Sequence, residues 1–179
     1  HPDPDALAAA FALQHLILIK TGQESTIAFG GVIGRRENLV MVRELEIKAV
    51  SIDAVDLNAY KVVCMVDTQP GTGNNSYPDD RTVDLVIDHH QPKSLTQACR
   101  WVDVRPEYGA SASILFEYLQ AQQVNIATKL ATILFYAIKS ETEDLGRDWT
   151  KSDRDAYLKL MPLCNNRILH EITHTKSSR

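Results

Sequence analysis

The sequence lacks any apolar run near the ~18 residues that a membrane-spanning helix needs, and it has no basic segment followed by an apolar secretory stretch. We therefore expect no transmembrane helix, no signal peptide and no contact with a membrane. Cysteine is scarce, and Cys64, Cys99 and Cys164 have no paired spacing. Because an odd, scattered set builds no disulfide framework, the cysteines fit a reducing, cytoplasmic location.

An excess of basic charge is also missing. The 179 residues include 19 basic and 23 acidic side chains, which give a formal net charge of -4. This balance argues against a large non-specific DNA-binding face but leaves room for a local patch that binds phosphate. There is no internal repeat and no low-complexity segment, so residues 1–179 are interpreted as a single domain.

Short apolar runs alternate with helical patterns through the first part of the chain, and helices dominate afterwards. Strands are predicted at 26–29, 49–52, 61–66, 83–87 and 100–104. Helices are predicted at 6–20, 35–45, 111–118, 127–139, 153–161 and 165–172. This order predicts an α/β fold with a mainly parallel sheet, helices on both faces and a helical C-terminal part.

Side chains that can bind metals gather at three places next to these elements: Asp3 with Asp5, then Asp67, then Asp88 with His89 and His90. The strands of a parallel sheet deliver their carboxyl ends to one edge, where ligands bind. Acidic groups crowded at such an edge repel each other unless cations hold them. The pattern therefore predicts a site for two divalent metals, and hence a metal-dependent hydrolase.

The two carboxylates around Pro4 are expected to point in different directions, so that Asp3 and Asp5 each serve a different metal. Asp67 has two oxygens and could bridge both metals. A pair of metals about 4 Å apart shares a bridging water and lowers its pKa. Next to the ligand His89, His90 could donate to a phosphate oxygen or protonate the leaving group.

Each motif alone has an ordinary explanation as a turn, a helix cap or a strand end, and only their joint order favours a metal site. A glycine-rich turn at 30–34 precedes a helix that begins with Arg35 and Arg36. Because a helix N-terminus and guanidinium groups suit phosphate, both arginines are predicted to bind substrate. A plain strand-to-helix turn with solvated charges is the alternative.

Together these segments resemble the DHH phosphoesterase superfamily. That superfamily includes RecJ-type exonucleases, oligoribonuclease/pAp phosphatases, cyclic-dinucleotide phosphodiesterases and family II inorganic pyrophosphatases. The resemblance covers nearly the whole chain as the N-terminal DHH domain, and it rests on motifs at 2–6, 66–68 and 86–90. In the place of the usual fourth motif, Thr-Asp-Thr, stands Ser140-Glu141-Thr142.

The resemblance implies two manganese ions, for which Mg2+ or Co2+ could substitute. Its metal ligands would be Asp3 for the first metal, Asp67 as the bridge, and Asp5, His89 and Glu141 for the second metal. Glu141 replaces the usual aspartate, and the neighbouring Glu143 and Asp144 are alternative ligands.

The same resemblance implies two catalytic residues. Asp88 would orient an imidazole, and His90 would face the substrate phosphate. The implied enzyme is a manganese-dependent phosphoesterase that hydrolyses phosphodiesters or phosphomonoesters of small nucleotides or of short RNA or DNA oligonucleotides. Short RNA and pAp-like nucleotides are the first expectation, and cyclic dinucleotides come next.

The family's first-motif histidine, with its strand, would lie upstream of residue 1, and the sequence contains nothing like the family's C-terminal substrate domain. We therefore expect a DHH domain that is truncated at its start and lacks that second domain. Two alternatives stay open: a family II inorganic pyrophosphatase-like enzyme and a non-catalytic nucleotide-sensing domain. A homodimer is also left open.

Overall fold

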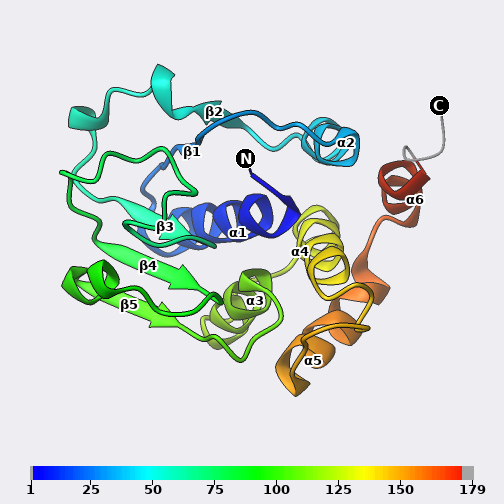
Figure 1. Ribbon diagram of the computed structural model, residues 1–179. Helices are drawn as coiled ribbons and strands as arrows, with labels where there is room; N and C mark the ends of the chain where they lie inside the picture. Colours follow the sequence, from blue (N-terminus) through cyan, green and yellow to red (C-terminus); the bar gives the residue numbers. More distant parts are fainter. Residues whose placement is uncertain (1, 175–179) are drawn as a thin grey trace.

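A computed structural model describes residues 2–174 and shows an α/β fold in which parallel sheets are flanked by helices (Figure 1). This confirms the predicted fold class. The strands are β1 (Ile27–Phe29), β2 (Ala49–Ser51), β3 (Cys64–Val66), β4 (Leu85–Asp88) and β5 (Trp101–Val104). The helices are α1 (Pro4–Thr21), α2 (Arg36–Glu44), α3 (Ser111–Ala121), α4 (Thr128–Glu141), α5 (Lys151–Leu160) and α6 (Asn166–His174).

The strands form two parallel sheets, one of β1 and β2 and one in the order β3-β4-β5. Between them runs a groove of about 580 Å³, lined by residues of β1, β3 and α1. The predicted buried strand at 61–66 is therefore shorter than expected. Only Cys64–Val66 is strand. Val62 is 58% exposed, because one edge of β3 faces the groove and has no neighbouring strand among residues 2–174.

Helix α1 lies at the centre of the core, where it packs against α3 and α4 (Figure 1). Its contact face carries the fully buried Ala8, Ala9 and Ala12, whose small side chains allow neighbouring helices to come close. The helix starts at Pro4, whose missing N–H costs nothing in the first turn. Since Asp3 is the N-cap, the start of α1 is also where the first acidic motif lies.

The helical C-terminal part packs onto this core. Helix α4 is apolar nearly all round and buries most of its length against α1. Helix α5 opens with a capping box in which the side chains of Thr150 and Asp153 satisfy each other's backbone N–H groups. Within residues 2–174, no helix combines the length and apolarity needed to cross a membrane.

Candidate metal centre

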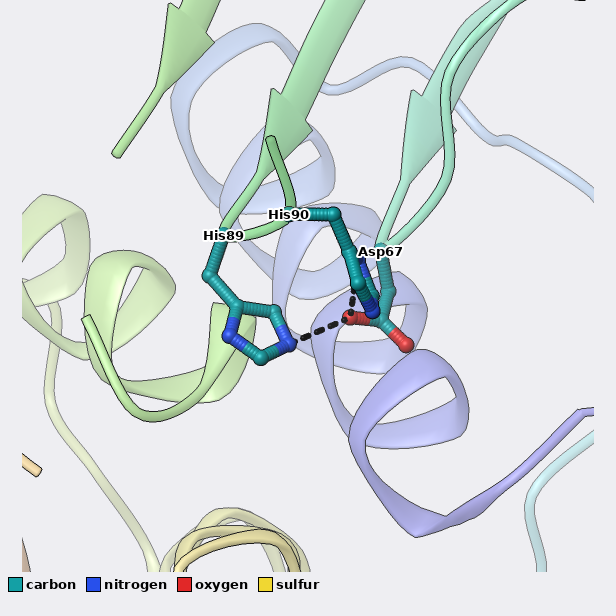
Figure 2. A group of neighbouring side chains, drawn as sticks. All are labelled: Asp67, His89 and His90. Carbon is teal, nitrogen blue, oxygen red and sulfur yellow. Dashed lines mark ion pairs between the residues drawn. The ribbon is translucent and has the colours of Figure 1, made fainter. Parts of the chain in front are cut away.

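The carboxyl ends of β3 and β4 bring the second and third motifs to one place (Figure 2). Asp67 directly follows β3, and Asp88 ends β4, so that His89 and His90 leave the sheet beside Asp67. Asp67, His89 and His90 each offer a ligand atom, and these atoms lie within 4.8 Å of one another. The first motif reaches the same edge from the start of α1, where Asp5 faces His89.

His89 lies between two carboxylates. Its Nε2 atom is 3.6 Å from Oδ2 of Asp5 and 3.4 Å from Oδ1 of Asp67. On the other side of the ring, Nδ1 lies 3.1 Å from the carbonyl oxygen of Tyr108, and because a carbonyl only accepts, Nδ1 donates. Buried Nε2 has no hydrogen-bond partner within residues 2–174, which is the arrangement of a histidine that binds metal through Nε2.

Backbone groups at the start of α3 hold the fully buried carboxylate of Asp5. The N–H groups of Ser111 and Ala112 donate to its two oxygens at 2.7 and 2.8 Å. The hydroxyl of Ser111 donates to Oδ1 of Asp67 at 2.9 Å. With the carbonyl of Tyr108 on His89, the segment 108–112 therefore contacts three of the predicted metal ligands.

Asp67 has a left-handed backbone, with a φ of 59°. Apart from glycine, the residues that adopt this conformation most readily are aspartate and asparagine. The turn lets the chain leave β3 while the carboxylate stays at the sheet edge, where Ser111 and His89 meet it. The residue type at position 67 is thus restricted by the backbone as well as by the site.

Burial and neighbouring charges shift the pKa values of the cluster. Burial and the charge of Asp67 raise the pKa of Asp5 well above its ordinary value, and the same two causes raise the pKa of Asp3. Burial alone would lower the pKa of His89, but its contact with Asp67 and the charge of Asp5 raise it to about 10. Oxygen and imidazole donors with excess negative charge fit a divalent cation, which would replace these protons.

Glu141, the last residue of α4, faces the same cluster. Its side chain is 28% exposed, and burial together with the charges of Asp3 and Asp67 raises its pKa. The alternative acids are engaged elsewhere: Asp144 accepts from Tyr157 and Lys139, and Glu143 pairs with Arg147. Glu141 itself lies 3.8 Å from the Arg147 guanidinium, and its role as a metal ligand stays a prediction.

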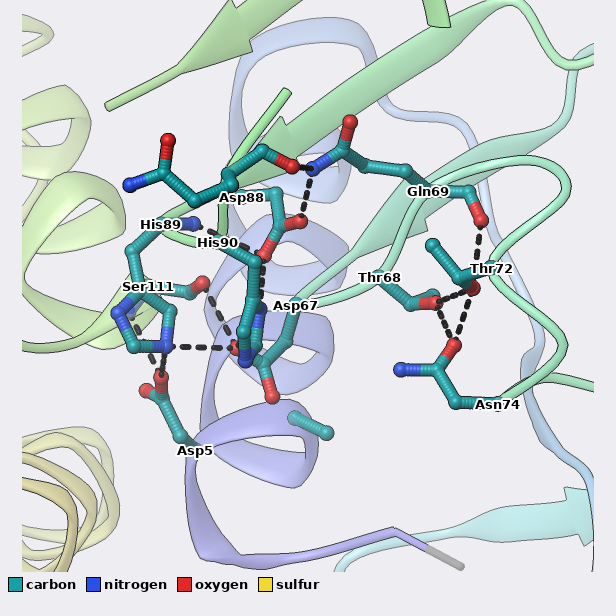
Figure 3. Close-up of polar contacts among 12 residues, drawn as sticks. Asp5, Asp67, Thr68, Gln69, Thr72, Asn74, Asp88, His89, His90 and Ser111 are labelled. Carbon is teal, nitrogen blue, oxygen red and sulfur yellow. Dashed lines mark hydrogen bonds and ion pairs between the residues drawn. The ribbon is translucent and has the colours of Figure 1, made fainter. Parts of the chain in front are cut away.

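Asp88 is fully buried behind the two histidines and contacts both (Figure 3). Its Oδ1 accepts from the backbone N–H of His89 and from Nδ1 of His90, both at 2.8 Å. The hydrogen bond with Nδ1 leaves Nε2 of His90 for other partners, and the His90 side chain is 52% exposed. Asp88 thus holds the His90 ring by a hydrogen bond, and the role of His90 towards substrate stays a prediction.

Arg35 and Arg36, the predicted substrate-binding residues, lie where α2 begins. Both are exposed at the start of α2, where Arg35 is the N-cap. The first turn of α2 is tied to the first motif, because Nδ2 of Asn38 donates to the carbonyl oxygen of Pro2 at 3.3 Å. Arg35 and Arg36 thus lie two and three residues before Asn38, whose side chain contacts the first motif at Pro2.

Sequence reasoning missed three residues that shape the site. Ser111 begins the predicted helix at 111–118, and its hydroxyl was not predicted to reach Asp67. Tyr108 acts through its carbonyl, for which a side chain gives no signal. Gln69 donates to Asp88 from the loop after β3, and only its place two residues after Asp67 could have pointed to it.

Comparison with known proteins agrees with this geometry. A family model described as the DHH family, N-terminal domain, matches residues 1–138. The chain belongs to the DHH family. It is also 39% identical over 178 residues to the uncharacterized protein MJ1633 of Methanocaldococcus jannaschii. That match covers 99% of this chain but 36% of the relative, so the chain spans about a third of the relative's length.

Two solved structures share the fold. A Methanococcus jannaschii protein assigned to the family II inorganic pyrophosphatases aligns with a TM-score of 0.71 and 20% identity, over 90% of this chain and 53% of that one. An exopolyphosphatase-related protein from Bacteroides fragilis aligns with a TM-score of 0.77 and 14% identity, over 99% of this chain and 55% of that one. At these identities the likeness establishes the DHH fold alone.

Proposed function

We propose that this DHH domain is the catalytic part of a manganese-dependent phosphoesterase that uses two metals. Its substrates would be phosphodiesters or phosphomonoesters of small nucleotides or short oligonucleotides, with short RNA and pAp-like nucleotides first. Arg35 and Arg36 would contact a substrate phosphate from the start of α2. The fold and family support a hydrolase of phosphoesters or phosphoanhydrides, and the choice of metal and substrate is our proposal.

One observation carries the proposal: the buried Nε2 of His89 lies between Asp5 and Asp67 without a hydrogen-bond partner within residues 2–174. Two buried carboxylates and an imidazole nitrogen are costly to assemble without a cation between them. Asp3 and Glu141 add two more acids around the same point. A site of this composition can hold two cations, for which Asp67 is the central ligand.

The protein's own groups would then position the reaction. Metals bound here would lower the pKa of a bound water, and their positive charge would lie opposite the phosphate oxygens. Tyr108 and Ser111 hold His89 and Asp67 in place, so little reorganisation is needed when substrate arrives. His90, anchored at Nδ1 by Asp88, can donate a proton from Nε2 to a phosphate or leaving-group oxygen at the open side of the site.

Hydrolysis of inorganic pyrophosphate is a second candidate, because a structural neighbour is assigned to the family II pyrophosphatases. The same metal cluster would serve a phosphoanhydride. A non-catalytic nucleotide sensor is the third candidate, and it would bind nucleotide without turnover. One set of assays on pAp, a short RNA and pyrophosphate separates all three.

The decisive experiment combines calorimetric titration of manganese with those assays. We expect two bound manganese ions and turnover of pAp or RNA by the wild type. Asp67→Asn should lose turnover by at least about a hundredfold while it stays folded, because asparagine accepts the left-handed backbone but cannot bridge two cations. Asp79→Asn, at an exposed loop position, is the matched control and should keep full activity.

Near-normal manganese-dependent turnover in Asp67→Asn would contradict the bridging role. Tight nucleotide binding by the metal-loaded wild type with no hydrolysis of any of the three substrates would favour the sensor. Pyrophosphate turnover without pAp or RNA turnover would favour the second candidate.

A further inference from the structure

Gln69 is a buried polar side chain between the second and third motifs. It lies two residues after Asp67, in the loop after β3, and is fully buried. Figure 3 shows it beside Asp88, on the side of the carboxylate away from His90. A buried amide is costly unless its hydrogen bonds are made, so its partners indicate what it holds in place.

All four hydrogen-bonding positions of the Gln69 amide are used. Oε1 accepts from the backbone N–H of Lys93 at 2.8 Å and from the hydroxyl of Thr96 at 2.7 Å. Nε2 donates to Oδ2 of Asp88 at 2.7 Å and to the carbonyl oxygen of Gln91 at 3.1 Å. Because Lys93 N–H can only donate, the amide oxygen must face it, and the NH2 group must face Asp88.

The two carboxylate oxygens of Asp88 accept hydrogen bonds from different partners. Oδ2 takes the hydrogen bond from Gln69, while Oδ1 takes those from the His89 backbone and from Nδ1 of His90. With Oδ2 fixed, the carboxylate plane is fixed, and Oδ1 is aimed at the His90 ring. Without that donor, Asp88 could rotate about its Cβ–Cγ bond, and the ring would lose its defined orientation.

Gln69 also ties together the two loops that carry the ligands. Its backbone belongs to the loop that starts at Asp67, and its side chain bonds the backbone of Gln91 and Lys93 in the loop that starts at His89. Both loops are irregular, and an amide between them with all its hydrogen bonds made restricts their relative movement. One side chain thus links the loop that carries Asp67 to the loop that carries the two histidines.

We infer that Gln69 is a positioning residue for the reaction: through Asp88 it sets the orientation of the His90 imidazole that faces the substrate phosphate. The inference rests on the proposed function for the role of His90. Its structural part, that Gln69 orients the ring, concerns the folded protein itself and is measurable without turnover.

The test compares Gln69→Met with Thr96→Val. Methionine has nearly the same volume as glutamine but donates nothing to Asp88. Valine at position 96 removes a hydrogen bond to the other end of the same amide. Thr96 is also buried, and within residues 2–174 no hydrogen bond joins it to Asp88. Both variants disturb one buried network, so a purely structural role would affect them alike.

Two readouts are informative. The first is the set of ring nitrogen resonances of His90 in the metal-free protein at one fixed pH, which report the hydrogen bond at Nδ1. The second is the division between kcat and KM for pAp hydrolysis with manganese, together with the number of bound manganese ions. We expect Gln69→Met to shift the His90 signals and to lower kcat about tenfold or more, with KM and manganese stoichiometry retained. Thr96→Val should keep the wild-type His90 signals and kcat.

Unchanged His90 signals in Gln69→Met would overturn the inference, and so would an equal loss of kcat in Thr96→Val. If the wild type hydrolyses nothing, the proposed function fails, and the His90 resonances alone still decide whether Gln69 orients the ring. Should Gln69→Met not fold, Gln69→Asn retains the amide but draws it back by about 1.5 Å. That variant should show the same His90 shift, and unaltered signals there would equally overturn the inference.

Discussion

The hydroxyl of Ser111 donates a hydrogen bond of 2.9 Å to Oδ1 of Asp67, from the first turn of α3 to the end of β3. The same carboxylate oxygen lies 3.4 Å from Nε2 of His89. A residue outside the four motifs therefore fixes the central ligand of the candidate metal centre. Partners of this kind orient a ligand before a cation arrives.

Ser111→Ala should weaken manganese binding or turnover by about ten- to a hundredfold, because Asp67 loses its anchor while the backbone donors to Asp5 remain. Calorimetry with manganese and steady-state hydrolysis measure the two effects. Ser113→Ala is the matched control: it lies in the same helix, its hydroxyl is buried, and within residues 2–174 it has no partner. Equal behaviour of the two variants would show that the Ser111 hydroxyl has no specific role.

Glu141 is the test of the fourth motif. Its position beside Asp3 and Asp67 predicts that Glu141→Ala weakens binding of one manganese ion and leaves the other in place. Glu141→Asp should retain measurable turnover, since it supplies the side chain usual in the family. Calorimetric stoichiometry checks both variants, and Asp144→Asn, whose carboxylate meets Tyr157 and Lys139, is the control. Two metals bound with wild-type affinity in Glu141→Ala would remove Glu141 from the ligand set.

Manganese binding should release protons near neutral pH. The folded pKa of His89 is raised to about 10, and the pKa of Asp5 is raised well above its ordinary value, so the metal-free cluster holds protons that a cation must displace. Calorimetry in two buffers with different ionisation enthalpies measures the number released. Apparent affinity should rise with pH between about pH 6 and pH 8. Equal binding heats in both buffers would mean that no proton is displaced.

The same shifts set the pH dependence of stability without metal. Groups with raised folded pKa values bind more protons when folded, so the free energy of unfolding falls as pH rises. For Asp5 the loss begins above the ordinary aspartate range, and for His89 it extends from about pH 6.5 toward the folded value of about 10. Thermal unfolding of metal-free protein should therefore shift to lower temperature from about pH 5 to about pH 8, and manganese should reverse the shift. A melting temperature that rises over this range would contradict the prediction.

Gly109 lies where the chain approaches another loop. A Cβ added there would lie 2.4 Å from the carbonyl oxygen of Asp148 and 2.8 Å from Cγ2 of Thr142. Its N–H donates to the buried carboxylate of Asp153 at 2.9 Å, which anchors the segment next to Tyr108. We expect Gly109→Ala to destabilise the protein by about 1–3 kcal/mol through overpacking, measured by denaturant unfolding. Gly34→Ala is the control for the added methyl group, because a Cβ there would come no closer than 4.0 Å to the nearest atom, the carbonyl oxygen of Val32.

The sequence predicted those parts of the fold that depend on short-range patterns. The apolar runs before Asp67 and Asp88 identified β3 and β4, because parallel strands are buried and end where polar residues begin. The same logic overestimated the strand at 61–66, since burial of Val62 would need a neighbour on the groove side. Division into two sheets depends on pairing between distant strands, for which a single sequence gives no signal.

For the candidate site, the types of the predicted metal ligands could be predicted from the sequence. The residues that hold those ligands in place could not. Carboxylates and imidazoles at strand ends indicate metal chemistry from their identity alone. Ser111 and Gln69 act through hydrogen bonds to residues 44 and 19 positions away. Neither residue type is unusual in its local context, so only the packing of α3 and of the loop after β3 reveals them.

Asp5 and Ala112, joined by a hydrogen bond of 2.8 Å, are 107 residues apart in the chain. Closing so long a loop is entropically costly, and contacts of this kind form late in folding. During synthesis, α1 emerges long before α3. The carboxylate of Asp5 therefore lacks its backbone donors until α3 docks on α1. We therefore expect the full geometry of the candidate metal centre to form only after the core is complete, so that cation binding would follow the early steps of folding.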